Sequence, residues 1–447
     1  MRIIVITLFL IIVSTTSFAQ QQLTLKDAIR IALHKNSTLQ KTQNNLETFE
    51  SGVLSAWGNF LPTLSAGANW SWSRSDVDGL LIQTISGVPI VSVSTESRDY
   101  NAGFSSGWTL FDGLSNFATL SQSENNLESA KLSLDRLKQD IIFQTMFFYY
   151  DVINAMKLLE VKQDDLKWNE ENLETIRERN KLGAATLADV YQQEVATGNA
   201  ELQIIKTNNR MESAENDLLY YLGLDVLEDY KFSDVLTEDE LKILNKDFTE
   251  DFEDITGFVN QALKQRMDYK SAELNLESSM DGITIARSGH LPSLSARGSV
   301  TWLGSKISEL DNSRRFSVGL SLNIPIFLGW SVSNRVQFAE VDAMNSEIEL
   351  SDLERNIKRE LRSTFLDLQA ALKGLNVSEN NVAAAGENLK IEEERYSLGS
   401  GKLLDVLIAN SQYTTALTDL INAQFAYIVL SEQLKYNLGV IDFTKYE

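Results

Sequence analysis

The sequence has 447 residues, a formal net charge of −22 and no cysteine. The acidic balance argues against nucleic acid as a partner, because phosphates repel carboxylates. Without cysteine no disulfide can form, so the fold must rely on other constraints. Hydrophobic residues make up 43% of the chain. No apolar run reaches the length of about 18 residues that a transmembrane helix needs.

The first residues predict a secretory signal peptide. The apolar run Ile3–Val13 follows Arg2, and Phe18-Ala19 places a small residue before a cleavage site. We expect residues 1–19 to be removed and the mature chain to be exported. A retained N-terminal anchor is the alternative.

The sequence contains two similar copies of one long segment. LPTLSA at 61–66 recurs as LPSLSA at 291–296, an offset of 230. Farther along the offset is 216, at which Gly183 matches Gly399 and Asp189 matches Asp405. A constant offset over such a distance indicates duplication. The offset of 216 already holds at Phe111 and Phe327, so the copies differ in length only between the LPxLSA motif and that position. We expect a surface loop there, and we expect this loop, near Gly87, to face outside the cell.

Four segments alternate between apolar and polar residues: 62–73, 100–111, 294–302 and 316–326. This period of two predicts strands with one apolar face, either in a soluble sandwich or in a membrane barrel. Small polar residues on the other face favour the barrel. The tryptophans suit a girdle at the membrane interface, which we assign to Trp70, Trp72, Trp108 and Trp302. Four strands are too few to close a barrel, so subunits must share it.

Long helices are predicted after each hairpin, at 115–181 and 331–397. Residues 115–181 contain neither glycine nor proline, and such a helix would be about 100 Å long. Apolar residues recur at alternating spacings of three and four, which indicates coiled-coil packing. A glycine turn follows each long helix, and return helices are expected at 187–222 and 403–438.

These elements define the expected organisation of the chain. A signal peptide precedes two copies of helix, β-hairpin, long helix and return helix, with an acidic segment between the copies. The expected ranges are the signal peptide 1–19, first repeat 20–222 with hairpin 62–111, acidic segment 223–256, second repeat 257–439 with hairpin 291–327, and tail 440–447.

No catalytic constellation stands out. The two histidines, His34 and His290, have no second histidine or cysteine at ligand spacing. No nucleotide-binding glycine loop occurs. We therefore expect no enzyme activity, no metal and no cofactor. A structural coiled-coil surface protein would also explain the helices and the export, but not the duplicated hairpins with their tryptophans.

The order of elements and two motifs resemble the TolC family of outer-membrane efflux proteins over the whole mature chain. The motifs are Phe60–Ser65 and Arg395–Gly399, the latter followed by Leu404–Leu407. The resemblance implies an α+β membrane protein of duplicated β-hairpins and long coiled-coil helices. Three copies would form a twelve-stranded outer-membrane β-barrel on a periplasmic α-helical barrel.

The resemblance also implies a function and partners. The homotrimer would be an exit duct that is embedded in outer-membrane lipid. It would receive substrates from a periplasmic adaptor (membrane fusion protein) and an inner-membrane pump. A type I secretion duct for proteins has the same architecture, and the sequence does not separate it from an efflux duct.

Residue by residue, the resemblance implies two sites in the periplasm. The duct would close by a polar link between Asp189 and Tyr396, by a ring of Asp405 carboxylates and by an apolar layer of Ile408. A second link is lost, since its positions hold Ala188 and Gly401. The adaptor would dock on the residues around the two glycine turns, which are Leu182, Gly183, Ala184, Thr186, Leu398, Gly399, Ser400 and Lys402.

Overall fold

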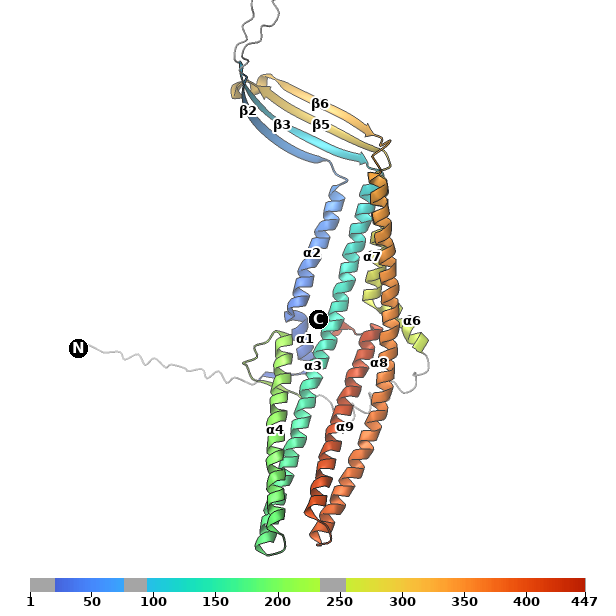
Figure 1. Ribbon diagram of the computed structural model, residues 1–447. Helices are drawn as coiled ribbons and strands as arrows, with labels where there is room; N and C mark the ends of the chain where they lie inside the picture. The colour runs from blue at the N-terminus through green and yellow to red at the C-terminus, as the bar shows by residue number, and fades with distance from the viewer. Residues whose placement is uncertain (1–20, 76–94, 234–254, 447) are drawn as a thin grey trace, which may run out of the picture. The chain divides into compact units, whose positions relative to one another are not determined.

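The structure is a computed structural model that describes residues 21–75, 95–233 and 255–446 (Figure 1). The predicted signal peptide, the loop around Gly87 and most of the acidic segment lie outside the described residues. The chain forms two compact units, each with residues from both sequence copies. The first unit comprises Met1–Thr42, Leu134–Arg266 and Arg355–Glu447, and the second comprises Gln43–Ser133 and Met267–Glu354.

An antiparallel four-stranded sheet belongs to the second unit. Its strands are β2 (Thr63–Ser75), β3 (Thr95–Phe111), β5 (Ser293–Gly304) and β6 (Arg314–Asn323), in the order β2-β3-β5-β6. The short helix η1 (Ile307–Asn312) connects β5 to β6. The two predicted hairpins therefore lie side by side in one sheet, and β2 and β6 are its edges.

The register of the strands collects the apolar residues on one face. Trp70 lies opposite Tyr100, and Phe104 lies opposite Val300, which in turn lies opposite Phe316. Because side chains alternate along a strand, the other face carries small polar residues. There the hydroxyls of Ser65 and Ser105 are 2.7 Å apart.

One predicted strand is too long. The alternation from 316 to 326 suggested that Ile324 and Ile326 extend the last strand, but β6 ends at Asn323. Proline has no N–H to donate to a neighbouring strand, and Pro325 interrupts the pattern between the two isoleucines. Ile324 and Ile326 remain exposed beyond the sheet.

Four long helices form nearly half of the chain. The two longest, α3 (Ser115–Lys181) and α8 (Ser331–Ser397), have 67 residues each, and the return helices α4 (Leu187–Leu222) and α9 (Leu403–Leu438) have 36 each. Their bounds coincide with the ranges expected from the sequence. None of the helices in the described ranges is apolar enough over a sufficient length to cross a membrane.

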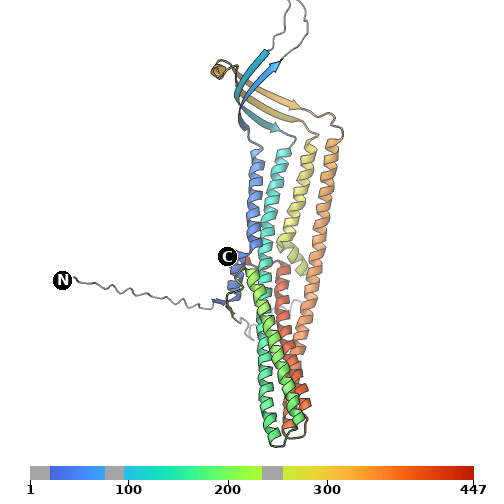
Figure 2. The same cartoon turned by 60° about the vertical axis from the view of Figure 1, so that its left-hand side comes forward.

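Coiled-coil positions form the core of the first unit. Ile141, Val152, Ile357 and Leu368, all at the predicted spacing on α3 and α8, are buried. Figure 2 shows the four helices α3, α4, α8 and α9 running side by side, with both turns at the same end. The other elements in the described ranges are shorter helices and a two-stranded parallel sheet: α1 (Leu25–Lys35), α2 (Ser37–Gly58), α6 (Ile255–Gln265), α7 (Met267–Ser288), η2 (Phe443–Lys445), β1 (Gln21–Leu23) and β4 (Tyr230–Phe232).

Candidate functional site

Two matching turns end the long helices, and glycine makes both possible. Gly183 and Gly399 have φ angles of 73° and 74°, in the left-handed region that other residues adopt only at a cost. Each N–H donates back into its helix, to the carbonyl of Asn180 at 2.9 Å and of Tyr396 at 3.1 Å. This pattern is the Schellman arrangement that stops a helix.

The predicted docking residues are exposed at these turns. The side chains of Leu182 and Leu398 are 83% and 82% exposed, so each turn presents one large apolar side chain to solvent. The remaining docking residues also lie on the surface: Gly183, Ala184, Thr186, Gly399, Ser400 and Lys402. Exposed leucines suit a contact with another protein.

Tyr396, the predicted gate tyrosine, sits between the two helix pairs. Its ring packs against a cluster of Ile176, Val190 and Leu403, and the guanidinium of Arg179 lies 5.2 Å from the ring centroid. Burial raises the pKa of Tyr396, the charge of Asp189 raises it further, and Arg179 opposes both. The hydroxyl therefore stays protonated at neutral pH and can donate a hydrogen bond.

The two matched aspartates differ in their local contacts. Asp189 forms a capping box with Thr186, whose backbone N–H and hydroxyl donate to its carboxylate at 2.8 Å and 2.7 Å. Lys402 replaces the threonine in the second copy and makes no side-chain cap. Asp189 is thus held within its own helix, although its charge reaches Tyr396, whereas Asp405 is not held by a cap.

Ile408 and Gly401 complete the predicted gate region. Ile408 is about half exposed, one turn after Asp405 on α9. A Cβ at Gly401 would lie 2.9 Å from the backbone nitrogen of Tyr396. Gly401 therefore lets the chain pass close to Tyr396, which explains why this position holds glycine instead of a polar side chain.

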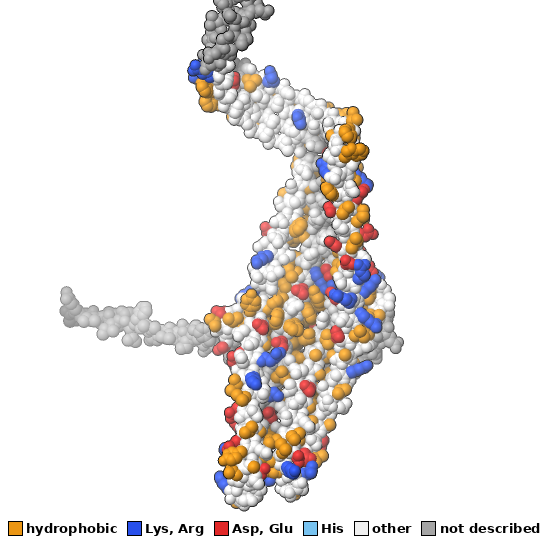
Figure 3. All heavy atoms as spheres, in the orientation of Figure 1, with side chains coloured by type: hydrophobic (Ala, Val, Ile, Leu, Met, Phe, Trp, Pro, Cys, Tyr) orange, Lys and Arg blue, Asp and Glu red, His pale blue; other side chains and the backbone are white. Residues whose placement is uncertain are grey.

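The predicted girdle tryptophans lie on the apolar face of the sheet. Trp70 and Trp72 are exposed, and Trp302 packs edge-on against Phe104. Trp108 donates its indole N–H to the carbonyl of Phe60 at 2.8 Å. The side of the sheet that Figure 3 shows is mostly white, so it carries mainly backbone and uncharged polar side chains. The apolar face is exposed at Leu320 and Phe316 as well, and an exposed apolar face is suited to lipid.

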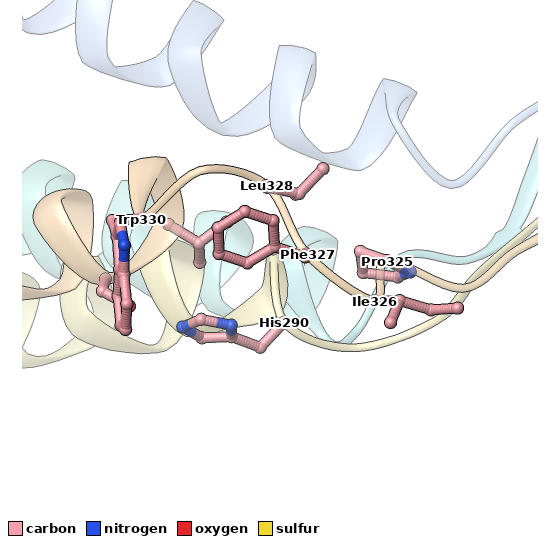
Figure 4. A pocket seen from close by; sticks show the side chains of 9 residues that line it. His290, Pro325, Ile326, Phe327, Leu328 and Trp330 are labelled. Atoms are coloured by element: carbon pink, nitrogen blue, oxygen red, sulfur yellow. The ribbon is translucent and has the colours of Figure 1, made fainter.

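A small hollow near the start of α8 contains one of the two histidines. Figure 4 shows His290 close to the rings of Phe327 and Trp330, with Pro325 and Ile326, which precede Phe327 in the chain, to the right. In the parts of the chain that the structure describes, no group of three or more His, Cys, Asp or Glu residues could hold a metal ion. The setting of His290 is apolar and aromatic, which suits a membrane interface.

A largely buried polar cluster lies on the same helices, farther from the two glycine turns, and was not predicted from the sequence. Asp165 and Asn169 on α3 bond to Asn410 on α9 and to Gln193 on α4. The partners are far apart in sequence, and no motif marks them. The only available signal was a polar residue at positions of coiled-coil spacing.

Comparison with known proteins finds a matching family and several similar proteins. The family described as outer membrane efflux protein matches residues 28–224 and 258–440. The outer membrane protein TolC of Salmonella enteritidis is 23% identical over 442 residues, which cover 96% of this chain and 84% of that protein. The proteases secretion protein PrtF of Dickeya chrysanthemi is 22% identical and covers 97% of this chain and 92% of its own length.

A solved structure shows the same fold. The Campylobacter jejuni CmeC outer membrane channel superimposes with a TM-score of 0.81 at 17% identity, covering 94% of this chain and 88% of that one. The chain belongs to the outer membrane efflux protein family. It is an outer-membrane exit duct for efflux or secretion, with a large periplasmic helical part.

Proposed function

We propose that three copies of this chain form one duct, which docks at its helical tips on a periplasmic adaptor and an inner-membrane pump. The observation that carries the proposal is the sheet. It has one apolar face and two edges, β2 and β6, that pair with no other strand within the described residues. Unpaired strand edges in a membrane are costly. Pairing β6 of one copy with β2 of the next removes both edges.

The exposed turns at Gly183 and Gly399 support docking at the tips. Both turns have left-handed glycines and exposed leucines, and both lie in the same compact unit. An adaptor with apolar tips would cover Leu182 and Leu398. The pump would supply the energy for export.

The substrate is either a protein or a small molecule. The likeness to a proteases secretion protein favours protein substrates, and the family description favours efflux of small molecules. The genes beside this one distinguish the two kinds of substrate. A proton-driven pump beside this gene supports small-molecule efflux, and an ATP-driven exporter supports protein secretion.

The gate would be formed by Tyr396, Asp405 and Ile408 near the tip. Threefold symmetry would bring three Asp405 carboxylates around one axis, where they attract cations. Tyr396 would join neighbouring helices through Asp189 and Arg179, which lie close enough to influence its hydroxyl. Ile408 would narrow the passage with an apolar layer.

Single-channel recording tests this gate. Tyr396→Phe should raise the conductance of the duct in a planar bilayer, since losing one hydroxyl hydrogen bond weakens closure by about 1 kcal/mol per subunit. Asp405→Ala should lessen block by multivalent cations. Wild-type conductance and block in both variants would place the gate elsewhere.

A further inference from the structure

A cluster of polar residues, most of them buried, joins three helices above the tips of the first unit. We call it the polar junction, and it consists of Asp165 and Asn169 on α3, Gln193 and Thr197 on α4, and Asn410 and Thr414 on α9. Gln193 is fully buried, Asn169 and the α4 and α9 members are nearly so, and Asp165 is partly buried. Buried polar groups are costly unless they are hydrogen-bonded, so their pairing must be accounted for.

One oxygen of Asp165 connects α3 to α9. Its Oδ1 accepts hydrogen bonds from Asn410 Nδ2 at 2.8 Å and from Thr414 Oγ1 at 3.2 Å. The same oxygen accepts from Asn169 Nδ2, one turn along α3, at 3.2 Å. A carboxylate forms stronger hydrogen bonds than a neutral acceptor. Asp165 therefore attaches the return helix of the second copy to the long helix of the first.

Asn169 extends the junction to α4. Its side-chain oxygen and its backbone carbonyl both accept from Gln193 Nε2 at 3.0 Å. Gln193 Oε1 in turn accepts from Asn172 Nδ2 at 3.0 Å, and the Thr197 hydroxyl bonds within α4. A hydrogen-bond network thus fastens α3 to α4, which form the first helix pair. Asp165 extends that network to α9.

The second helix pair, α8 and α9, lacks the matching network. At the offset of 216, Asn169 corresponds to Ala385, and Gln193 corresponds to Ala409. Small side chains there leave an open groove between α8 and α9, with Ala384, Ala385 and Ala416 among its lining residues. The duplication has therefore diverged: amides fasten α3 to α4, and no matching amides join α8 to α9. Asp165 bonds α9 to α3, beside the bonds of Lys162 to Thr418 at 3.2 Å and of Asn154 to Asn422 at 3.3 Å.

We propose that Asp165 is a positioning residue for transport. It holds α9 on α3 and so opposes separation of the helix pair α3–α4 from the helix pair α8–α9 when the duct opens. This inference rests on the proposed function, in which the tips contain the gate. The contact of Ile176 with Leu403 near the tip lies eleven residues farther along α3, about 16 Å. Stiff helices transmit a displacement over that distance, so loosening the junction loosens the tip.

Recordings from the purified full-length protein in planar bilayers test the inference. Asp165→Ala removes the shared acceptor of both hydrogen bonds to α9. It should raise the mean conductance by at least about fivefold, the factor that the loss of a single hydrogen bond gives. Asp164→Ala is the matched control, because it removes the same charge from the neighbouring exposed position. It should conduct like the wild type.

A reversible cross-link tests the opposite direction and does not depend on how well Asp165→Ala folds. The chain has no native cysteine, so Asp165→Cys with Asn410→Cys introduces the only thiols. A bis-methanethiosulfonate reagent should link them, lower the conductance below that of the untreated pair, and lose its effect when dithiothreitol is added. The pair Asp164→Cys and Asn410→Cys should not be linked.

The outcomes separate the inference from the function on which it rests. Wild-type conductance supports the duct. If the duct conducts but neither Asp165→Ala nor the cross-link changes its conductance, the positioning role is overturned and the duct stands. Failure of the thiols to cross-link would also overturn it. A wild-type protein that conducts nothing would contradict the duct and the inference together.

Discussion

Leu320→Lys should prevent the chain from entering the outer membrane. Leu320 lies in the middle of β6 on the apolar face, opposite Ala296, and is 72% exposed. A lysine on the lipid face of a membrane strand costs about 2–4 kcal/mol near the middle of the bilayer. In a trimer the cost applies three times. Fractionation of cells should find the variant depleted from the outer membrane and degraded or aggregated in the periplasm.

The neighbouring position supplies the control. Ser321 belongs to the polar face, opposite Ser295, and Ser321→Lys adds the same charge at the same level of the strand. This variant should still insert, because the proposed duct is filled with water. Equal amounts of both variants in the outer membrane would mean that the apolar face does not meet lipid.

Gly399→Pro should abolish transport and leave the membrane trimer intact. Proline fixes φ near −65°, whereas Gly399 has a φ of 74°, and proline also lacks the N–H that bonds to Tyr396. The turn between α8 and α9 must then rearrange, and with it the proposed docking surface. Export of substrate by cells, together with the mass of the extracted particle, measures both halves of the prediction.

Asparagine at the same position is the matched control. Asparagine tolerates the left-handed conformation better than other non-glycine residues, and a Cβ atom at Gly399 would meet no atom within 4 Å. Gly399→Asn should therefore keep most of the transport activity. Normal transport by Gly399→Pro would show that the adaptor does not depend on this turn.

Much of the fold follows from local features of the sequence. Helix α3 begins after Gly113 and ends before Gly183, with no glycine or proline between them, so its bounds were readable directly. The strands could be assigned because apolar residues alternate, and the register then collects them on one face. Pro325 was present in the sequence, but its effect on the end of β6 was missed.

The pairing of residues across helices could not be predicted in the same way. Asp165 and Asn410 are separated by 245 positions, and a polar residue on a long helix ordinarily faces water. The compact units also divide the chain differently from the repeats, since each unit contains residues of both copies. Duplication shows which segments are alike, whereas packing decides which of them meet.

The mass of the detergent-extracted particle tests the central claim most directly. One chain has a mass of 50.2 kDa before removal of the signal peptide. Analytical ultracentrifugation, corrected for bound detergent, should give slightly less than three times that mass. A single chain that stays monodisperse in buffer without detergent would contradict a shared membrane barrel and, with it, the trimeric duct.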